Sequence, residues 1–173
     1  MDWKGIKAIT FDVDGVMTDG SLLAFDNHDM VRVFNAKDSF AVRVAIMRGI
    51  KVGVFTGGST EGVRNRLRTC DIPAENIYMG CRGKLECFRE FCGRNGVAES
   101  EVAYIGDDIA DIPLIKAAGI GAVPADGAVD ALAAADYRCN VPGGRGCVRE
   151  VIELVLRARG LWYFNDEDYK LIF

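Results

Sequence analysis

Near its N-terminus the chain reads Ile6-Lys7-Ala8-Ile9-Thr10-Phe11-Asp12-Val13-Asp14-Gly15. The apolar run over residues 6–13 predicts a strand buried on both faces, as in the centre of a parallel sheet. Asp12 would place a charge within this apolar run, which is costly unless a partner or a cation meets it. Asp14-Gly15 predicts the turn that ends the strand. The stretch therefore predicts a parallel sheet with a polar site at one edge.

The rest of the chain alternates short apolar runs with amphipathic segments. We expect further strands at 51–55, 77–79, 102–105, 120–123 and 137–139, and helices at 39–48, 60–69, 84–94, 109–118, 128–135 and 147–159. Asp38 is the expected N-cap of the first helix, and Gly49 is expected to end it. Segments 21–25 and 31–34 flank a turn-rich stretch at 26–29 and predict a β-hairpin.

This order of elements predicts an α/β fold in which helices cover both faces of one parallel sheet. We expect a single Rossmann-like domain over residues 1–173, because the length suits one well-buried core. The hairpin occupies about residues 20–34. A C-terminal tail of aromatic and acidic residues, about 161–173, is expected to pack on an oligomer.

Composition narrows the classes of function. Net charge is −4, which argues against nucleic-acid binding through phosphate neutralisation. The sequence shows no secretory signal and no apolar run long enough for a bilayer, so we expect a cytoplasmic protein without a membrane partner. The six cysteines show no metal-ligand spacing with His28. We expect reduced thiols rather than a zinc site or a disulfide framework.

Polar residues follow several predicted strands, and the carboxyl ends of parallel strands form the ligand-binding edge of such a sheet. These residues are Asp12 and Asp14 after the first strand, Thr56 and Gly57 after the 51–55 strand, Lys84 after the 77–79 strand, and Asp107, Asp108 and Asp111 after the 102–105 strand. Clustered carboxylates repel one another unless a cation holds them, and oxygen ligands favour Mg²⁺. A carboxylate beside that ion can attack phosphorus. Taken singly, Thr56, Lys84, Asp108 and Asp111 also have ordinary roles as cap, turn or solvated residues, but the convergence of the whole set with Asp12 favours phosphoryl chemistry.

The ordered set of motifs resembles the haloacid dehalogenase superfamily of phosphatases. It comprises Asp12-Val13-Asp14-Gly15, Thr56-Gly57, Lys84 and Gly106-Asp107-Asp108-Ile109-Ala110-Asp111. The resemblance implies an aspartyl-phosphate intermediate on Asp12, with Asp14 as general acid and then base. It implies that Thr56, Gly57 and Lys84 bind phosphate. Mg²⁺ would be held by Asp12, the backbone carbonyl of Asp14, and Asp107, with Asp108 and Asp111 supporting these ligands.

The short hairpin leaves no room for a large cap domain. Together with Phe34-Asn35-Ala36-Lys37-Asp38, it resembles the cap-less branch that acts on octulosonate and nonulosonate phosphates. These substrates are small phosphorylated sugar acids. The resemblance implies that the octulosonate enzymes serve lipopolysaccharide synthesis. This branch forms homotetramers in which hairpins assemble and neighbouring subunits complete each site. By resemblance, the substrate contacts are Asn35, Ala36, Lys37, Asp38, Ser39, Arg43 and Arg66. The two arginines suit a sugar-acid carboxylate, although a solvated helix face explains either one nearly as well.

Two departures from the branch concern the substrate rather than the chemistry. Arginine often follows Thr-Gly in the second motif, where this chain has Gly58, and glycine often stands where this chain has Ser39. Arg82 could supply the missing charge. The likeness favours an eight-carbon 8-phosphate, with a nine-carbon sialic-type 9-phosphate as the alternative. A receiver-like signalling domain is a further alternative, but such domains place the phospho-accepting Asp after the third strand.

Overall fold

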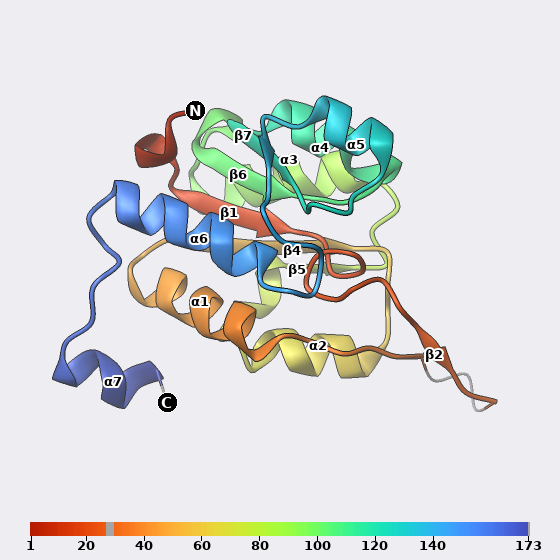
Figure 1. Ribbon diagram of the computed structural model, residues 1–173, viewed down its shortest axis with the longest axis horizontal. Coiled ribbons are helices and arrows are strands. Elements are labelled where there is room, and N and C mark those ends of the chain that lie inside the picture. Colours follow the sequence, from red (N-terminus) through yellow and green to blue (C-terminus); the bar gives the residue numbers. More distant parts are fainter. Residues whose placement is uncertain (27–29, 173) are drawn as a thin grey trace.

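The computed structural model describes residues 1–26 and 30–172. Its main sheet has the strand order β5-β4-β1-β6-β7-β8, and every neighbouring pair is parallel (Figure 1). The strands are β1 (Ala8–Phe11), β4 (Lys51–Thr56), β5 (Ile77–Met79), β6 (Val102–Ile105), β7 (Ile120–Val123) and β8 (Tyr137–Arg138). β1 is buried along its whole length, which confirms the predicted central strand. It ends at Phe11, so Asp12 lies just beyond it.

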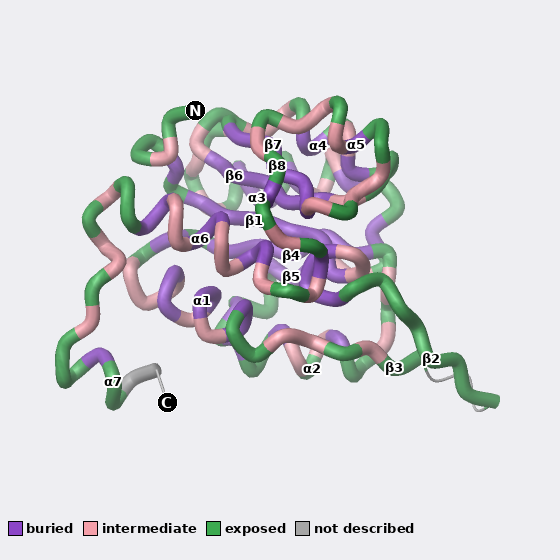
Figure 2. The backbone as a smooth tube through the Cα atoms, in the orientation of Figure 1, coloured by how far each residue is buried: buried purple, intermediate pink, exposed green. Residues whose placement is uncertain are grey.

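Helices cover both faces of the sheet, as the sequence predicts (Figure 1). They are α1 (Ala36–Met47), α2 (Glu61–Arg68), α3 (Lys84–Asn95), α4 (Ile112–Ala117), α5 (Val129–Ala134), α6 (Cys147–Ala158) and α7 (Asp166–Ile172). One apolar cluster lies under α1, α2 and α6, and a second lies under α3, α4 and α5. The purple core of Figure 2 follows the sheet between these two layers. The central strands are therefore dry on both faces, and only their ends offer room for a polar site.

The prediction for the start of α1 is wrong. Asn35 is the N-cap, and its side-chain oxygen accepts a hydrogen bond from the Lys37 N–H at 2.9 Å. Asp38 lies in the first turn and is completely buried. Gly49 follows the helix with a φ of +82°, in the left-handed region that favours glycine, as predicted. The predicted helix at 109–118 is a 3₁₀ turn, Ile109–Asp111, followed by α4.

The predicted hairpin is present, with β2 (Leu23–Ala24) antiparallel to β3 (Met30–Val31). It projects from the body of the molecule and is exposed (Figures 1 and 2). Of the predicted turn at 26–29, positions 27–29 lie outside the described residues. The large apolar side chains of the hairpin are solvent-exposed. The hairpin is therefore an unburied apolar surface next to the carboxyl edge of the sheet.

The tail returns to α1 of its own chain. Arg48 forms an ion pair with Asp168 at 2.8 Å and donates to the carbonyl of Tyr163 at 2.6 Å. The ring of Phe164 packs against Phe40. No helix among residues 1–26 and 30–172 has the length and apolar character to cross a membrane.

The cysteine expectation is wrong at one pair. Cys81 and Cys87 are joined by a disulfide, so the prediction of six reduced thiols does not hold. Cys70, Cys92, Cys139 and Cys147 are buried free thiols, as expected. The two bonded cysteines are six residues apart, and this spacing does not by itself indicate a disulfide. A loop after β5 and the first turns of α3 bring them together.

Candidate active site

Asp12 lies at the point where β1 ends and the chain begins to turn. Its side chain is nearly buried, with 8% of the residue exposed. One carboxylate oxygen, Oδ1, accepts from the Val13 N–H at 2.6 Å, and Oδ2 accepts from the Lys84 ammonium at 2.6 Å. The charge that would be costly inside the sheet is thus met by a cation and a backbone donor.

Lys84 is the first residue of α3 and bridges two acidic residues from different strand ends. Besides Asp12, its Nζ donates to Oδ1 of Asp111 at 2.7 Å. The Tyr104 hydroxyl donates to the same oxygen at 2.6 Å. The other oxygen of Asp111 accepts from the backbone N–H of Asp107 at 3.0 Å and of Asp108 at 3.3 Å. Protein donors therefore engage both oxygens of Asp111, which ties Lys84 to the loop that follows β6.

Asp12, Asp107 and Asp111 form a cluster suited to a cation. One carboxylate oxygen from each lies within 4.8 Å of the others. Burial, together with the charge of Asp111, raises the pKa of Asp12 to about 6 against the opposing effect of Lys84. Burial and the neighbouring carboxylates raise the pKa of Asp107 to about 7. A bound cation relieves such repulsion, so the donor set fits the predicted Mg²⁺.

Backbone geometry brings the first and fourth motifs together. Gly15 has a φ of +79°, and a Cβ at this position would collide with the carboxylate of Asp107. Only glycine allows this close approach, so the loop after β1 and the loop after β6 can share one ion. Asp111 accepts four hydrogen bonds and Asp12 two, whereas no donor among the described residues reaches the carboxylate of Asp107, so Asp107 is the carboxylate of this cluster that most needs a cation.

Thr56 and Asp14 lie beside this cluster. Thr56 ends β4, is buried, and its hydroxyl oxygen accepts from the Gly58 N–H at 3.1 Å. Asp14 binds Arg32, which comes from the hairpin: Nε donates to Oδ1 at 2.6 Å and Nη2 donates to Oδ2 at 3.0 Å. The structure thus brings five predicted residues to the carboxyl edge of the sheet: Asp12, Asp14, Lys84, Asp107 and Asp111.

Comparison with known proteins agrees with this geometry. Residues 40–119 match the family model described as haloacid dehalogenase-like hydrolase. The chain is 34% identical over 157 residues to 3-deoxy-D-manno-octulosonate 8-phosphate (KDO 8-phosphate) phosphatase from Salmonella typhi, covering 91% of this chain and 82% of that protein. The phosphatase of the same name from Escherichia coli K12 gives the same identity and coverage. This chain is a haloacid dehalogenase-like hydrolase.

Solved structures of this hydrolase family share its fold. The KDO 8-phosphate phosphatase from Yersinia pestis superposes with a TM-score of 0.89 at 32% identity, over 92% of this chain and 85% of that one. The enzyme from Moraxella catarrhalis, solved with magnesium, phosphate and KDO, gives 0.87 at 31% identity, over 92% and 90%. The predicted α/β fold and the family resemblance are confirmed.

The residues predicted to contact substrate in this hydrolase lie in different places. Arg66 donates to the Ser39 hydroxyl and lies over the ring of Phe34. Arg43 donates from Nε and Nη2 to the carbonyl of Thr69, at the C-terminal end of α2. Arg66 therefore lies near the hairpin, whereas Arg43 binds the end of a neighbouring helix.

Residues 35–38, which were also predicted to contact substrate, differ in their exposure and in their contacts. The Asn35 amide donates to the Gly144 carbonyl at 3.1 Å. Ala36 and Lys37 are exposed. Asp38 is buried and accepts from the Arg149 N–H at 2.7 Å, which caps α6. Their substrate contacts stay predictions, and within this chain Asn35 and Asp38 connect α1 to the segment before α6 and to its first turn.

Sequence reasoning missed two residues of this site. Tyr104 looked like an ordinary strand residue, and nothing local marks its bond to Asp111. Arg32 interrupts the apolar hairpin run Met30-Val31-Arg32-Val33, and a cation in that run was the available signal. Arg82, expected to compensate for Gly58, is exposed, whereas Arg32 Nη2 lies 3.3 Å from the position of a Cβ at Gly58.

Proposed function

We propose that this hydrolase removes phosphate from KDO 8-phosphate with Mg²⁺, in the synthesis of lipopolysaccharide precursors. The buried Lys84 bridge between Asp12 and Asp111, beside Asp107, carries the proposal, because it presents a carboxylate nucleophile and a positive charge at one point. The relatives named for KDO 8-phosphate support the substrate. A cation held by Asp12, Asp107 and the Asp14 carbonyl would offset charge on the phosphoryl group.

The proposed reaction has two steps. An oxygen of Asp12 bonds to phosphorus while the bond from phosphorus to the sugar oxygen breaks, and Asp14 gives its proton to that sugar oxygen. Asp14 then takes a proton from water as the water oxygen attacks phosphorus, which releases inorganic phosphate and restores the Asp12 carboxylate. Lys84 holds Asp12 in place, and together with the Thr56 hydroxyl and the backbone N–H of Gly57 it binds the phosphoryl oxygens.

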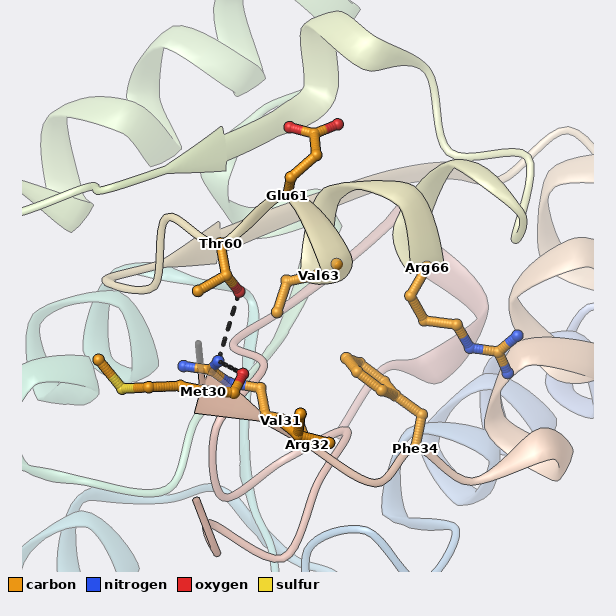
Figure 3. A pocket seen from close by; sticks show the side chains of 9 residues that line it. Met30, Val31, Arg32, Phe34, Thr60, Glu61, Val63 and Arg66 are labelled. Carbon is orange, nitrogen blue, oxygen red and sulfur yellow. Dashed lines mark hydrogen bonds between the residues drawn. The ribbon is translucent and has the colours of Figure 1, made fainter. Parts of the chain in front are cut away.

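A pocket beside this edge suits the sugar part of the substrate. The cavity is about 430 Å³ and lies between the hairpin and α2. Figure 3 shows Phe34 between Arg32 and Arg66 in this pocket, with the Arg32 guanidinium bonded to Thr60. Of the two arginines predicted to contact substrate, Arg43 and Arg66, it is Arg66 that lines this pocket. We therefore assign the sugar-acid carboxylate to Arg66.

The hairpins support self-association. Leu23, Phe25 and Val33 are 60%, 55% and 75% exposed, and together they form an apolar surface on a projecting element. We propose that four copies meet through this surface and that each site is completed by a neighbour. Light scattering after gel filtration would show a tetramer, and Leu23→Asp would shift it to smaller species. A monomeric wild type contradicts this part of the proposal.

Turnover of the two candidate substrates tests the activity. We expect a higher kcat/KM for KDO 8-phosphate than for a nine-carbon sialic-type 9-phosphate, and loss of both activities in EDTA. The reverse ranking would assign the enzyme to nine-carbon acids. A persistent phosphoryl-protein without turnover would instead support a receiver-like domain. Binding of the ion has its own readout: Mg²⁺ raises the Tm of the wild type, and Asp107→Asn removes most of that increase.

A further inference from the structure

Arg32 connects the hairpin to the reacting edge of the sheet. It follows β3, and the planar fork of its guanidinium meets both oxygens of Asp14, at 2.6 Å and 3.0 Å. Only 5% of the Arg32 side chain is exposed. A two-bond contact of this kind fixes the plane of a carboxylate as well as its position, which a single lysine bond does not.

The rest of the guanidinium is also held. Nη1 donates to the Met30 carbonyl at 3.2 Å and to the Thr60 hydroxyl at 3.4 Å. These contacts tie the arginine to its own hairpin and to the residue that precedes α2 (Figure 3). The second N–H of Nη2 has no hydrogen-bond partner among residues 1–26 and 30–172.

The Nη2 atom of Arg32 lies beside the loop that follows β4. A Cβ built at Gly58 would be 3.3 Å from Arg32 Nη2, 3.4 Å from Thr56 Oγ1 and 3.8 Å from Asp14 Oδ2. The point next to Gly58 therefore touches the arginine, the threonine and the carboxylate at once. The missing side chain at Gly58 leaves room for the guanidinium beside Thr56 and Asp14.

We propose that Arg32 is a positioning residue that holds the Asp14 carboxyl beside the leaving oxygen, and that Gly58 provides the space for it. This inference rests on the proposed function. The clamp takes one lone pair from each Asp14 oxygen, and each oxygen has a second lone pair that can carry the transferred proton. The hairpin thus contributes to catalysis within its own chain, through Asp14.

The test compares two esters that differ in their need for an acid. Release of p-nitrophenol needs no proton, whereas release of a sugar alkoxide does. For Arg32→Met we expect kcat on KDO 8-phosphate to fall by about 100-fold, the scale of a misplaced catalytic group. The pre-steady-state burst of p-nitrophenol from p-nitrophenyl phosphate should stay within a few fold of wild type. Arg32→Lys should recover part of the loss.

Controls separate positioning from folding. Arg64→Met removes a half-exposed cation from α2, whose partner Glu61 lies 3.7 Å away, and should leave both rates unchanged. Gly58→Ala keeps the arginine but crowds Nη2, so it should show the same selective loss, smaller in size, even if Arg32→Met does not fold. Equal losses on both esters, or no loss on KDO 8-phosphate, would overturn the inference. A wild type that hydrolyses neither ester would instead refute the proposed function, and the inference with it.

Discussion

Replacing Lys84 with methionine should destabilise the metal-free protein and disable it as an enzyme. The ammonium is the shared partner of Asp12 and Asp111, at 2.6 Å and 2.7 Å, and both carboxylates are buried. Removing one partner of a buried ion pair costs about 3–5 kcal/mol, because a charge is left without compensation. For a protein of this length that corresponds to a loss of roughly 6–20 °C in Tm.

The same substitution should change how the rate depends on pH. Burial raises the pKa of Asp12, and the charge of Lys84 opposes this effect. Without the lysine the pKa rises further, so a smaller fraction of Asp12 is ionised at neutral pH. We expect kcat to fall by at least about 100-fold, as when one charge-stabilising group is lost. The acid limb of the pH–rate profile should move to higher pH.

Lys116→Met is the matched control, because Lys116 lies exposed on α4. Its unfolding free energy should stay within about 0.5 kcal/mol of wild type. In chemical unfolding with EDTA, Lys84→Met and Asp111→Asn should be non-additive by about 0.5–3 kcal/mol, since both break one contact. If Lys84→Met lost no more stability than Lys116→Met and kept its turnover, the reasoning about the bridge would be refuted.

Three further substitutions test the site and its surroundings. Asp12→Asn should abolish phosphate release while circular dichroism shows the fold retained, and undiminished release would exclude Asp12 as nucleophile. Asp14→Asn should slow both the formation and the breakdown of the phosphoryl-enzyme in rapid-quench measurements, by about 10²–10⁴-fold; an effect on one step alone would contradict its double role. Burial raises the pKa of Asp38 from 3.8 to about 6, so the folded protein binds more protons than the unfolded chain between these values and loses stability as pH rises through them. Asp38→Asn should remove about 3 kcal/mol of that pH dependence in urea unfolding, and parallel curves for the two proteins would show that Asp38 is not its source.

Local sequence patterns predicted most of the fold because they report burial directly. The apolar run before Asp12 and the turn at Asp14-Gly15 sufficed to place the central strand and the edge where the site lies. The start of α1 was predicted wrongly because Asn35 and Asp38 are both good N-cap residues and only the backbone decides between them. Asp38 instead caps α6, more than a hundred residues away, through the Arg149 N–H. No local pattern encodes such a contact.

The three aspartates of the fourth motif show why the site was harder to predict than the fold. In the sequence, Asp107, Asp108 and Asp111 are equivalent carboxylates after one strand. In the structure Asp108 accepts from the Ile109 N–H at 2.7 Å and acts as a cap, whereas Lys84, Tyr104 and two backbone groups bind both oxygens of Asp111. Among the described residues no hydrogen-bond donor reaches the carboxylate of Asp107. A carboxylate with a raised pKa and no protein donor gains most from a cation, so among these three aspartates the number of donors, rather than the place in the motif, points to Asp107 as the candidate metal ligand.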